Sequence, residues 1–201
     1  MHGITIVRTN IGKSNLLYSI CFAIILPILY FSSLKLIPEN IISDLINLTG
    51  NSAARLSESL GISSSFEEGI ITISGFRMLI NFECTAAHYI LMFVSAVVAW
   101  PFHNIRYKLI GIGIGIATIF SINILRIVIV GAMGAHSPPV FDFIHNYLWQ
   151  GTFFLAVFFI YFFWVSNDYT FIPAIKFAGI SLISIAFFIF CLDFIVKPYI
   201  I

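Results

Sequence analysis

Charged residues are scarce in this sequence. Only 9% of the 201 residues are Asp, Glu, Lys or Arg, whereas 60% are hydrophobic, and soluble proteins average roughly a quarter charged and half apolar. So few charges cannot keep a soluble surface hydrated. The net charge of +1, without a basic stripe, gives no sign of a nucleic-acid partner. We therefore predict an all-α polytopic membrane protein whose surroundings are the lipid bilayer.

Cysteine is also rare. Cys21, Cys84 and Cys191 are far apart, and two of them fall inside apolar runs, so their spacing offers neither a CxxC pair nor a zinc cluster. A disulfide framework is not expected. The amino terminus lacks the small-residue cleavage site of a secretory signal, and its apolar run is long enough to be a retained helix.

Long apolar runs, by contrast, recur along the chain. A spanning helix needs about 20 mostly apolar residues, and five segments are candidates: 15–34, 84–100, 109–133, 148–165 and 174–196. We predict one integral membrane domain, 1–201, with five transmembrane helices and an extracytoplasmic insertion at 35–83.

The orientation follows from where Lys and Arg collect, because cytoplasmic loops are rich in both. With the amino terminus inside, the inner segments are basic, whereas the insertion is acidic. The inner charges are Arg8, Lys13, Arg106, Lys108 and Lys176 against Asp168; the insertion carries Glu39, Asp44, Glu58, Glu67, Glu68 and Glu83 against Lys35, Arg55 and Arg77. We therefore predict a cytoplasmic amino terminus and an extracytoplasmic carboxyl terminus in the cytoplasmic membrane, with the opposite orientation as the alternative.

The insertion has two parts. Residues 41–60 repeat apolar side chains at helical spacing, which predicts a helix lying on the membrane surface. The stretch GIITISGFRMLI predicts two short strands around Ser74 and Gly75, with an irregular loop as the alternative. Further on, GIGIG in the span 109–133 places small residues where helices pack closely in lipid.

Arg126 is an anomaly inside the third predicted span. A charged side chain there costs about 2.5 to 3.5 kcal/mol on insertion scales, so we expect it to face a polar interior and mark a site. If the span ends at Met133, Arg126 lies about 10 Å below the outer surface, and snorkelling to the headgroups is the alternative. Asn123, one turn earlier, is predicted to hold the guanidinium in place.

Cys84 precedes the second predicted span at the outer face. Free N–H groups at a helix start and a nearby arginine favour a thiolate, whereas adjacent Glu83 opposes it. A lone cysteine at such an edge is more often a small buried hydrophobe. Because the Arg126 cation suits a thiolate and an oxyanion, we predict that Cys84 is a nucleophile.

Two histidines compete for the acid/base role that a cysteine nucleophile needs. His145 lies just before the fourth predicted span on the outer side, and Asp142 is placed to orient its ring. The alternative for His145 is an interfacial residue in an aromatic belt. His88 is four residues after Cys84 and is expected one turn along the same helix face.

A cysteine before one span, an arginine in the outer half of the next and a histidine before the one after it resemble the exosortase/archaeosortase family. The resemblance rests on ECTAAH around Cys84, on NILR ending at Arg126, and on His145, and it covers residues 70–155. ECTAAH matches the family's Cys-Ser/Thr-Gly/Ala pattern. The chain departs from the pattern in having fewer predicted spans than many exosortases, and an alanine where larger members often have glycine.

The resemblance implies a membrane-embedded cysteine transpeptidase with Cys84 as nucleophile, Arg126 as cationic stabiliser and His145 as acid/base, without metal or cofactor. Its substrates would be membrane-anchored exported proteins with carboxyl-terminal sorting signals, cut at the outer face and passed to a lipid-linked or glycan-linked envelope acceptor, or to water. Two alternatives are a channel, transporter or assembly subunit that binds an anion at Arg126, and a membrane phosphatase, whose usual lysine-rich and Ser-Gly-His motifs are absent.

Overall fold

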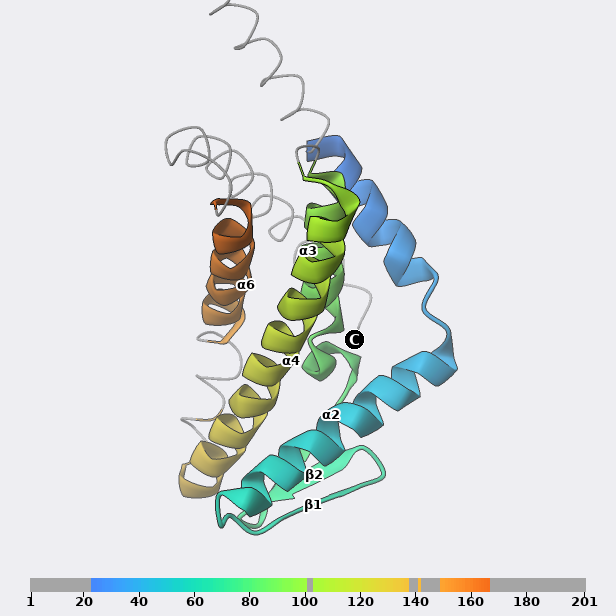
Figure 1. The fold of residues 1–201 in the computed structure, drawn as a ribbon. Coiled ribbons are helices and arrows are strands. Elements are labelled where there is room, and N and C mark those ends of the chain that lie inside the picture. Colours follow the sequence, from blue (N-terminus) through green and yellow to red (C-terminus); the bar gives the residue numbers. More distant parts are fainter. Residues whose placement is uncertain (1–22, 101–102, 138–140, 142–148, 167–201) are drawn as a thin grey trace, which may run out of the picture.

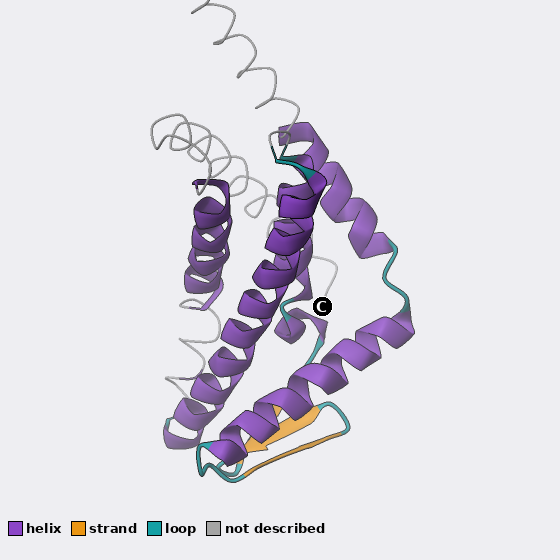
Figure 2. Ribbon diagram, viewed as in Figure 1, coloured by secondary structure: helices purple, strands orange, loops and turns teal. Residues whose placement is uncertain are grey.

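The computed structural model describes residues 23–100, 103–137, 141 and 149–166. This part of the chain is mainly helical, with one small sheet beside α2 (Figure 2). In chain order the elements are the helical segment Ala23–Lys35, α2 (Glu39–Ser59), β1 (Ser64–Glu67), β2 (Ile70–Ile73), β3 (Phe76–Leu79), the 3₁₀ helix η1 (Phe82–Thr85), α3 (Ala87–Ala99), α4 (Ile105–His136) and α6 (Trp149–Ser166).

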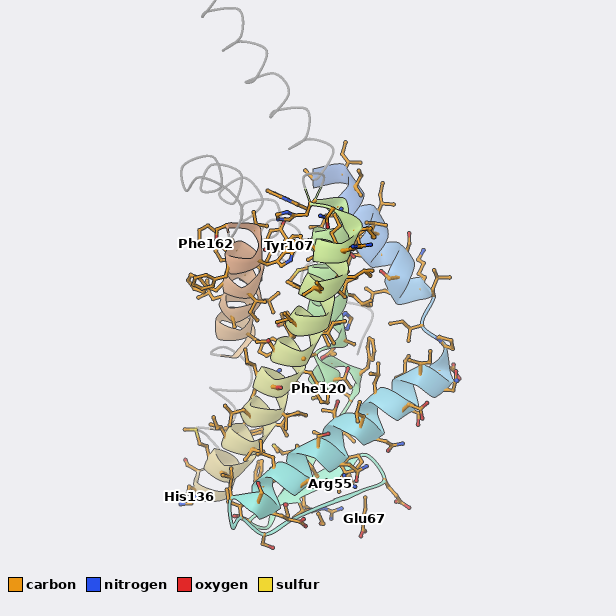
Figure 3. All side chains as sticks on the ribbon, viewed as in Figure 1. Arg55, Glu67, Tyr107, Phe120, His136 and Phe162 are labelled. Carbon is orange, nitrogen blue, oxygen red and sulfur yellow. The ribbon has the colours of Figure 1, made fainter. Side chains whose placement is uncertain are left out.

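Helix α4 is the central element, and α2, α3, α6, η1 and the sheet all contact it. It begins at a cap in which the side chain of Asn104 accepts a hydrogen bond from the Tyr107 N–H. Its 32 residues make a helix about 48 Å long, roughly 18 Å longer than the hydrocarbon core of a bilayer is thick. Figure 3 labels Tyr107 and His136 near its two ends.

The five-span prediction is not confirmed. Among the described helices, α4 is the one long and apolar enough by itself to cross a membrane. The span 109–133 lies inside α4, and the span 148–165 corresponds to α6. The span 84–100 is instead η1 followed by an α3 of 13 residues, about 20 Å long.

The remaining spans are described in part or not at all. The residues of the span 15–34 from Ala23 onward form a helix, which is bent by 94° relative to α2. The two helices are long and apolar enough to cross a membrane only when they are counted as one span. The predicted span 174–196 lies outside the described residues.

The predicted helix at 41–60 is confirmed as α2. Its buried face consists of small residues, namely Thr49, Gly50, Ala53, Ala54 and Ser57, which lets its backbone come close to its neighbours. A Cβ added at Gly50 would meet the ring of Phe66 on β1, so the glycine makes room for that ring. The location of α2 on the membrane surface stays a prediction.

The predicted hairpin is confirmed, and it belongs to a three-stranded antiparallel sheet of order β1-β2-β3. Both turns have two residues, Glu68-Gly69 and Ser74-Gly75, and all four have positive φ. This conformation is the type I′ turn that suits the twist of a hairpin. Strand β1 was not predicted, because SSFE is short and mostly polar.

The sheet packs against the helices through one face. Ile71 and Ile73 of β2 are 0% exposed, and on β3 Phe76 and Met78 lie against Gly134 and Gly131 of α4. Helix α3 in turn places Phe93 against Gly115. The chain from β3 to α3 therefore runs antiparallel to α4, beginning at the carboxyl-terminal end of α4.

Two of the three glycines of GIGIG, Gly111 and Gly115, serve packing, as predicted. A Cβ added at Gly115 would overlap the ring of Phe93, and one added at Gly111 would overlap Trp164, whereas Gly113 faces open space. We expect Gly115→Val to lower the melting temperature of the purified protein in detergent, because overpacking costs about 1 to 3 kcal/mol. Gly113→Val is the matched control, and an equal loss in both variants would contradict this packing.

Candidate active site

Cys84 lies in η1, where its position is fixed by Asn81. The side-chain oxygen of Asn81 accepts a hydrogen bond from the Cys84 N–H at 3.2 Å, and its backbone carbonyl lies 3.0 Å from the same nitrogen. The side chain is half-buried, and its Sγ lies 4.0 Å from the carbonyl oxygen of Leu79. The thiol is therefore held on a capped single turn, rather than on the first turn of a spanning helix as predicted.

Ala86 separates that turn from α3. It has φ 61° and ψ 7°, the left-handed conformation, and is only 1% exposed. A residue with a Cβ loses about 1 to 2 kcal/mol in this conformation, whereas glycine adopts it freely. Because Ala86 breaks the helix, the prediction that Cys84 and His88 share one helix face is wrong.

His88 is engaged by its surroundings. Its Nδ1 is 3.0 Å from the Tyr30 hydroxyl, and its ring packs edge-on against Phe82 with centroids 4.9 Å apart. Glu83, which is exposed on η1, also interacts with His88 electrostatically. These contacts give His88 a role in holding the helical segment Ala23–Lys35 against α3.

Arg126 points into the helix bundle. Its guanidinium carbon lies 5.8 Å from the centroid of the Phe153 ring on α6, and Phe153 is 1% exposed. Tyr89 of α3 packs edge-on against the same ring at 4.6 Å. The guanidinium lies within electrostatic range of Cys84 and Tyr89. This cation–π contact holds the guanidinium against α6, inside the group of described helices, and snorkelling to the headgroups stays an alternative.

Asn123 ties α4 to the turn that carries the thiol. It is 0% exposed, and its Nδ2 donates a hydrogen bond of 2.7 Å to the Cys84 carbonyl. Its Oδ1 has no hydrogen-bond partner within the described ranges. The prediction that Asn123 holds the Arg126 guanidinium is therefore wrong. The amide fixes the backbone of Cys84 instead.

The structure thus brings together Cys84, Asn123 and Arg126, with Glu83 beside the thiol. His145 and Asp142 lie outside the described residues. Sequence reasoning missed Tyr89, whose polar tip in an otherwise apolar run was the available signal. It also missed Phe153, because this residue is one of many aromatic residues in its predicted span and nothing in the sequence distinguishes it from the others.

We expect Asn123→Leu to raise the rate at which a membrane-impermeant thiol reagent alkylates Cys84. The change removes the amide that binds the Cys84 carbonyl, and a lost buried hydrogen bond is worth about 1 to 3 kcal/mol, enough for about a tenfold change in local opening. The assay uses a background in which Cys21 and Cys191 are alanine. Ile124→Leu, on the same turn, is the control, and equal rates in both variants would contradict the anchoring role.

A comparison of the sequence with protein families gives a match. The model of the transmembrane exosortase (Exosortase_EpsH) matches residues 9–164, a stretch that contains every candidate residue named above. No curated protein and no solved structure matches the chain. The family match confirms the resemblance found in the sequence, and it establishes a location in a membrane. The chain belongs to the transmembrane exosortase family.

Proposed function

We propose that this exosortase is a cysteine transpeptidase that cuts the carboxyl-terminal sorting signals of exported proteins at the outer face of the cytoplasmic membrane. The observation that carries the proposal is the contact between α4 and η1. Asn123 donates a hydrogen bond to the Cys84 carbonyl, and one turn further along α4 the Arg126 guanidinium lies within electrostatic range of the thiol. A nucleophile and an oxyanion stabiliser on two adjoining elements are what acyl transfer requires.

The length of α4 supports a site just inside the outer boundary of the hydrocarbon core. If Leu109 marks the inner boundary, next to the basic Arg106 and Lys108, 20 residues of helix reach Val128 and fill the hydrocarbon core. Arg126 then lies about 3 Å inside the outer boundary and Asn123 about 8 Å inside it. This depth suits a peptide bond at the point where a substrate helix leaves the lipid.

In the proposed reaction the Cys84 thiolate attacks the carbonyl carbon of the scissile peptide bond, and the oxyanion that forms faces Arg126. The C–N bond then breaks. The departing amine takes a proton from a histidine, and the acyl group stays on Cys84 as a thioester. An acceptor amine attacks the thioester, or water does, which restores the thiol.

We assign the proton transfer to His145, with Asp142 orienting its ring, rather than to His88. His88 lies beyond the helix break at Ala86, and its ring is hydrogen-bonded to Tyr30 and packed on Phe82. A ring held in this way serves packing better than proton shuttling.

The test is co-reconstitution of the purified protein in liposomes with a tagged protein from the same genome that ends in a short motif, one apolar helix and a basic tail. We expect mass spectrometry to show cleavage just outside the membrane helix. Added hydroxylamine should convert the tagged product into a hydroxamate, because it attacks thioesters. A substrate that stays whole, or that breaks equally in liposomes without the exosortase, would overturn the proposal.

A further inference from the structure

Strand β3 has one edge that no described strand pairs with. Ile73 and Phe76 flank the two-residue turn and form a hydrogen-bonded pair. Hydrogen-bonded pairs alternate with non-hydrogen-bonded pairs along an antiparallel ladder, so the next hydrogen-bonded pair is Ile71 and Met78. The bond from the Ile80 N–H to the Gly69 carbonyl, 2.8 Å long, continues that alternation. Arg77 and Leu79 therefore direct their N–H and C=O groups away from β2.

This edge ends at the thiol. The carbonyl oxygen that lies 4.0 Å from the Cys84 Sγ belongs to Leu79, and it is one of the groups that the register directs outward. The side chains of Arg77 and Leu79 are also exposed, Leu79 to 69%. An extended peptide lying along residues 77–79 would therefore arrive at the nucleophile.

The direction of the chain matches that of a substrate. Phe76 lies against Gly134, Met78 against Gly131, and Asn123 binds Cys84, so β3 runs from the outer end of α4 toward the membrane. A substrate whose extracytoplasmic segment precedes its membrane helix runs the same way, from outside inward. The two chains would thus be parallel.

We propose that the extended segment just before the substrate's membrane helix adds to β3 as a parallel fourth strand. The proposal rests on the function proposed above. Main-chain hydrogen bonds to Arg77 and Leu79 hold the segment, as in other cases of strand addition. The other edge of the sheet is less suited, because α2 packs against β1 through Phe66 and through the hydrogen bond from Ser64 Oγ to the Ala54 carbonyl.

The first test compares Arg77→Pro with Arg77→Ala. Proline removes an N–H that the ladder with β2 does not use, and proline is tolerated at such edge positions. We expect kcat/KM for the tagged substrate to be up to about tenfold lower in the proline variant than in the alanine variant, because one main-chain hydrogen bond to the substrate is lost. Equal values in two variants with equal melting temperatures would overturn the proposal.

A second test does not depend on the fold of a proline variant. A photoreactive phenylalanine analogue replaces Arg77, or as a control Ser65 on β1, in the Cys84→Ala background, with the tagged substrate as probe. We expect a crosslink from position 77 and none from 65. Cleavage by the wild type without a crosslink at 77 would overturn the docking alone. A crosslink at 77 without cleavage would support the docking and contradict the proposed reaction.

Discussion

Cys84→Ala is expected to abolish processing of the sorting-signal substrate, with a loss of at least about 1000-fold in rate, because without the thiolate no thioester forms. Cys84→Ser should be nearly as inactive, since an unactivated hydroxyl is a much weaker nucleophile than a thiolate. The measurement is the initial rate of substrate cleavage in liposomes. Added hydroxylamine should give no hydroxamate with either variant.

The other two cysteines supply the matched controls. Cys21→Ala and Cys191→Ala are expected to process the substrate at the wild-type rate, because neither residue belongs to the proposed site. Full processing by Cys84→Ala would show that the transpeptidase proposal is wrong. The rival function, a channel, transporter or assembly subunit that binds an anion at Arg126, predicts that Cys84→Ser keeps its function while Arg126→Ala loses it.

Arg126→Ala is expected to lower kcat about 100- to 1000-fold, the cost of removing one oxyanion-stabilising group. KM should change much less, because the interaction is strongest in the transition state. Arg126→Lys should recover only part of the rate. An ammonium group keeps the charge but loses the planar guanidinium that lies over Phe153. Steady-state kinetics with the tagged substrate separate the two parameters.

Arg106→Lys is the control for the conservative change. It lies on the same helix at the basic end, away from the site, and should process the substrate at the wild-type rate. If Arg126→Ala raised KM and left kcat unchanged, Arg126 would be a binding residue for the substrate, and the oxyanion role would be refuted.

Much of the fold could be predicted because each element leaves its own local pattern of apolar, polar and turn residues in the sequence. The apolar run that became α4, the helical periodicity of α2 and the Ser74-Gly75 turn all depend on local patterns. The error in α3 also came from a local pattern. An apolar run indicates burial but does not show how much of the run is one continuous helix, so a segment whose α-helix has 13 residues was predicted as a full span.

The candidate site was predictable in its residue types and less so in its contacts. Cys84 and Arg126 were found because a thiol and a charge stand out in apolar surroundings. The hydrogen bond from Asn123 to the Cys84 carbonyl joins residues 39 positions apart, and only tertiary packing decides such a partner. Alanine is the best helix former, so nothing in CTAAH indicated that Ala86 breaks the helix.

The excess length of α4 fixes the depth in the membrane at which the proposed cleavage takes place. With Leu109 as the inner boundary, most of the excess lies on the outer side, where α4 supports the sheet, and the hydrogen bond from Asn123 sets the depth of the Cys84 backbone. Under the proposed function, the bond to be cut is selected by its depth in the membrane as well as by residue type. A substrate helix longer by one turn would shift its scissile bond by about 5 Å, past the thiol, so helix length itself becomes part of the sorting signal.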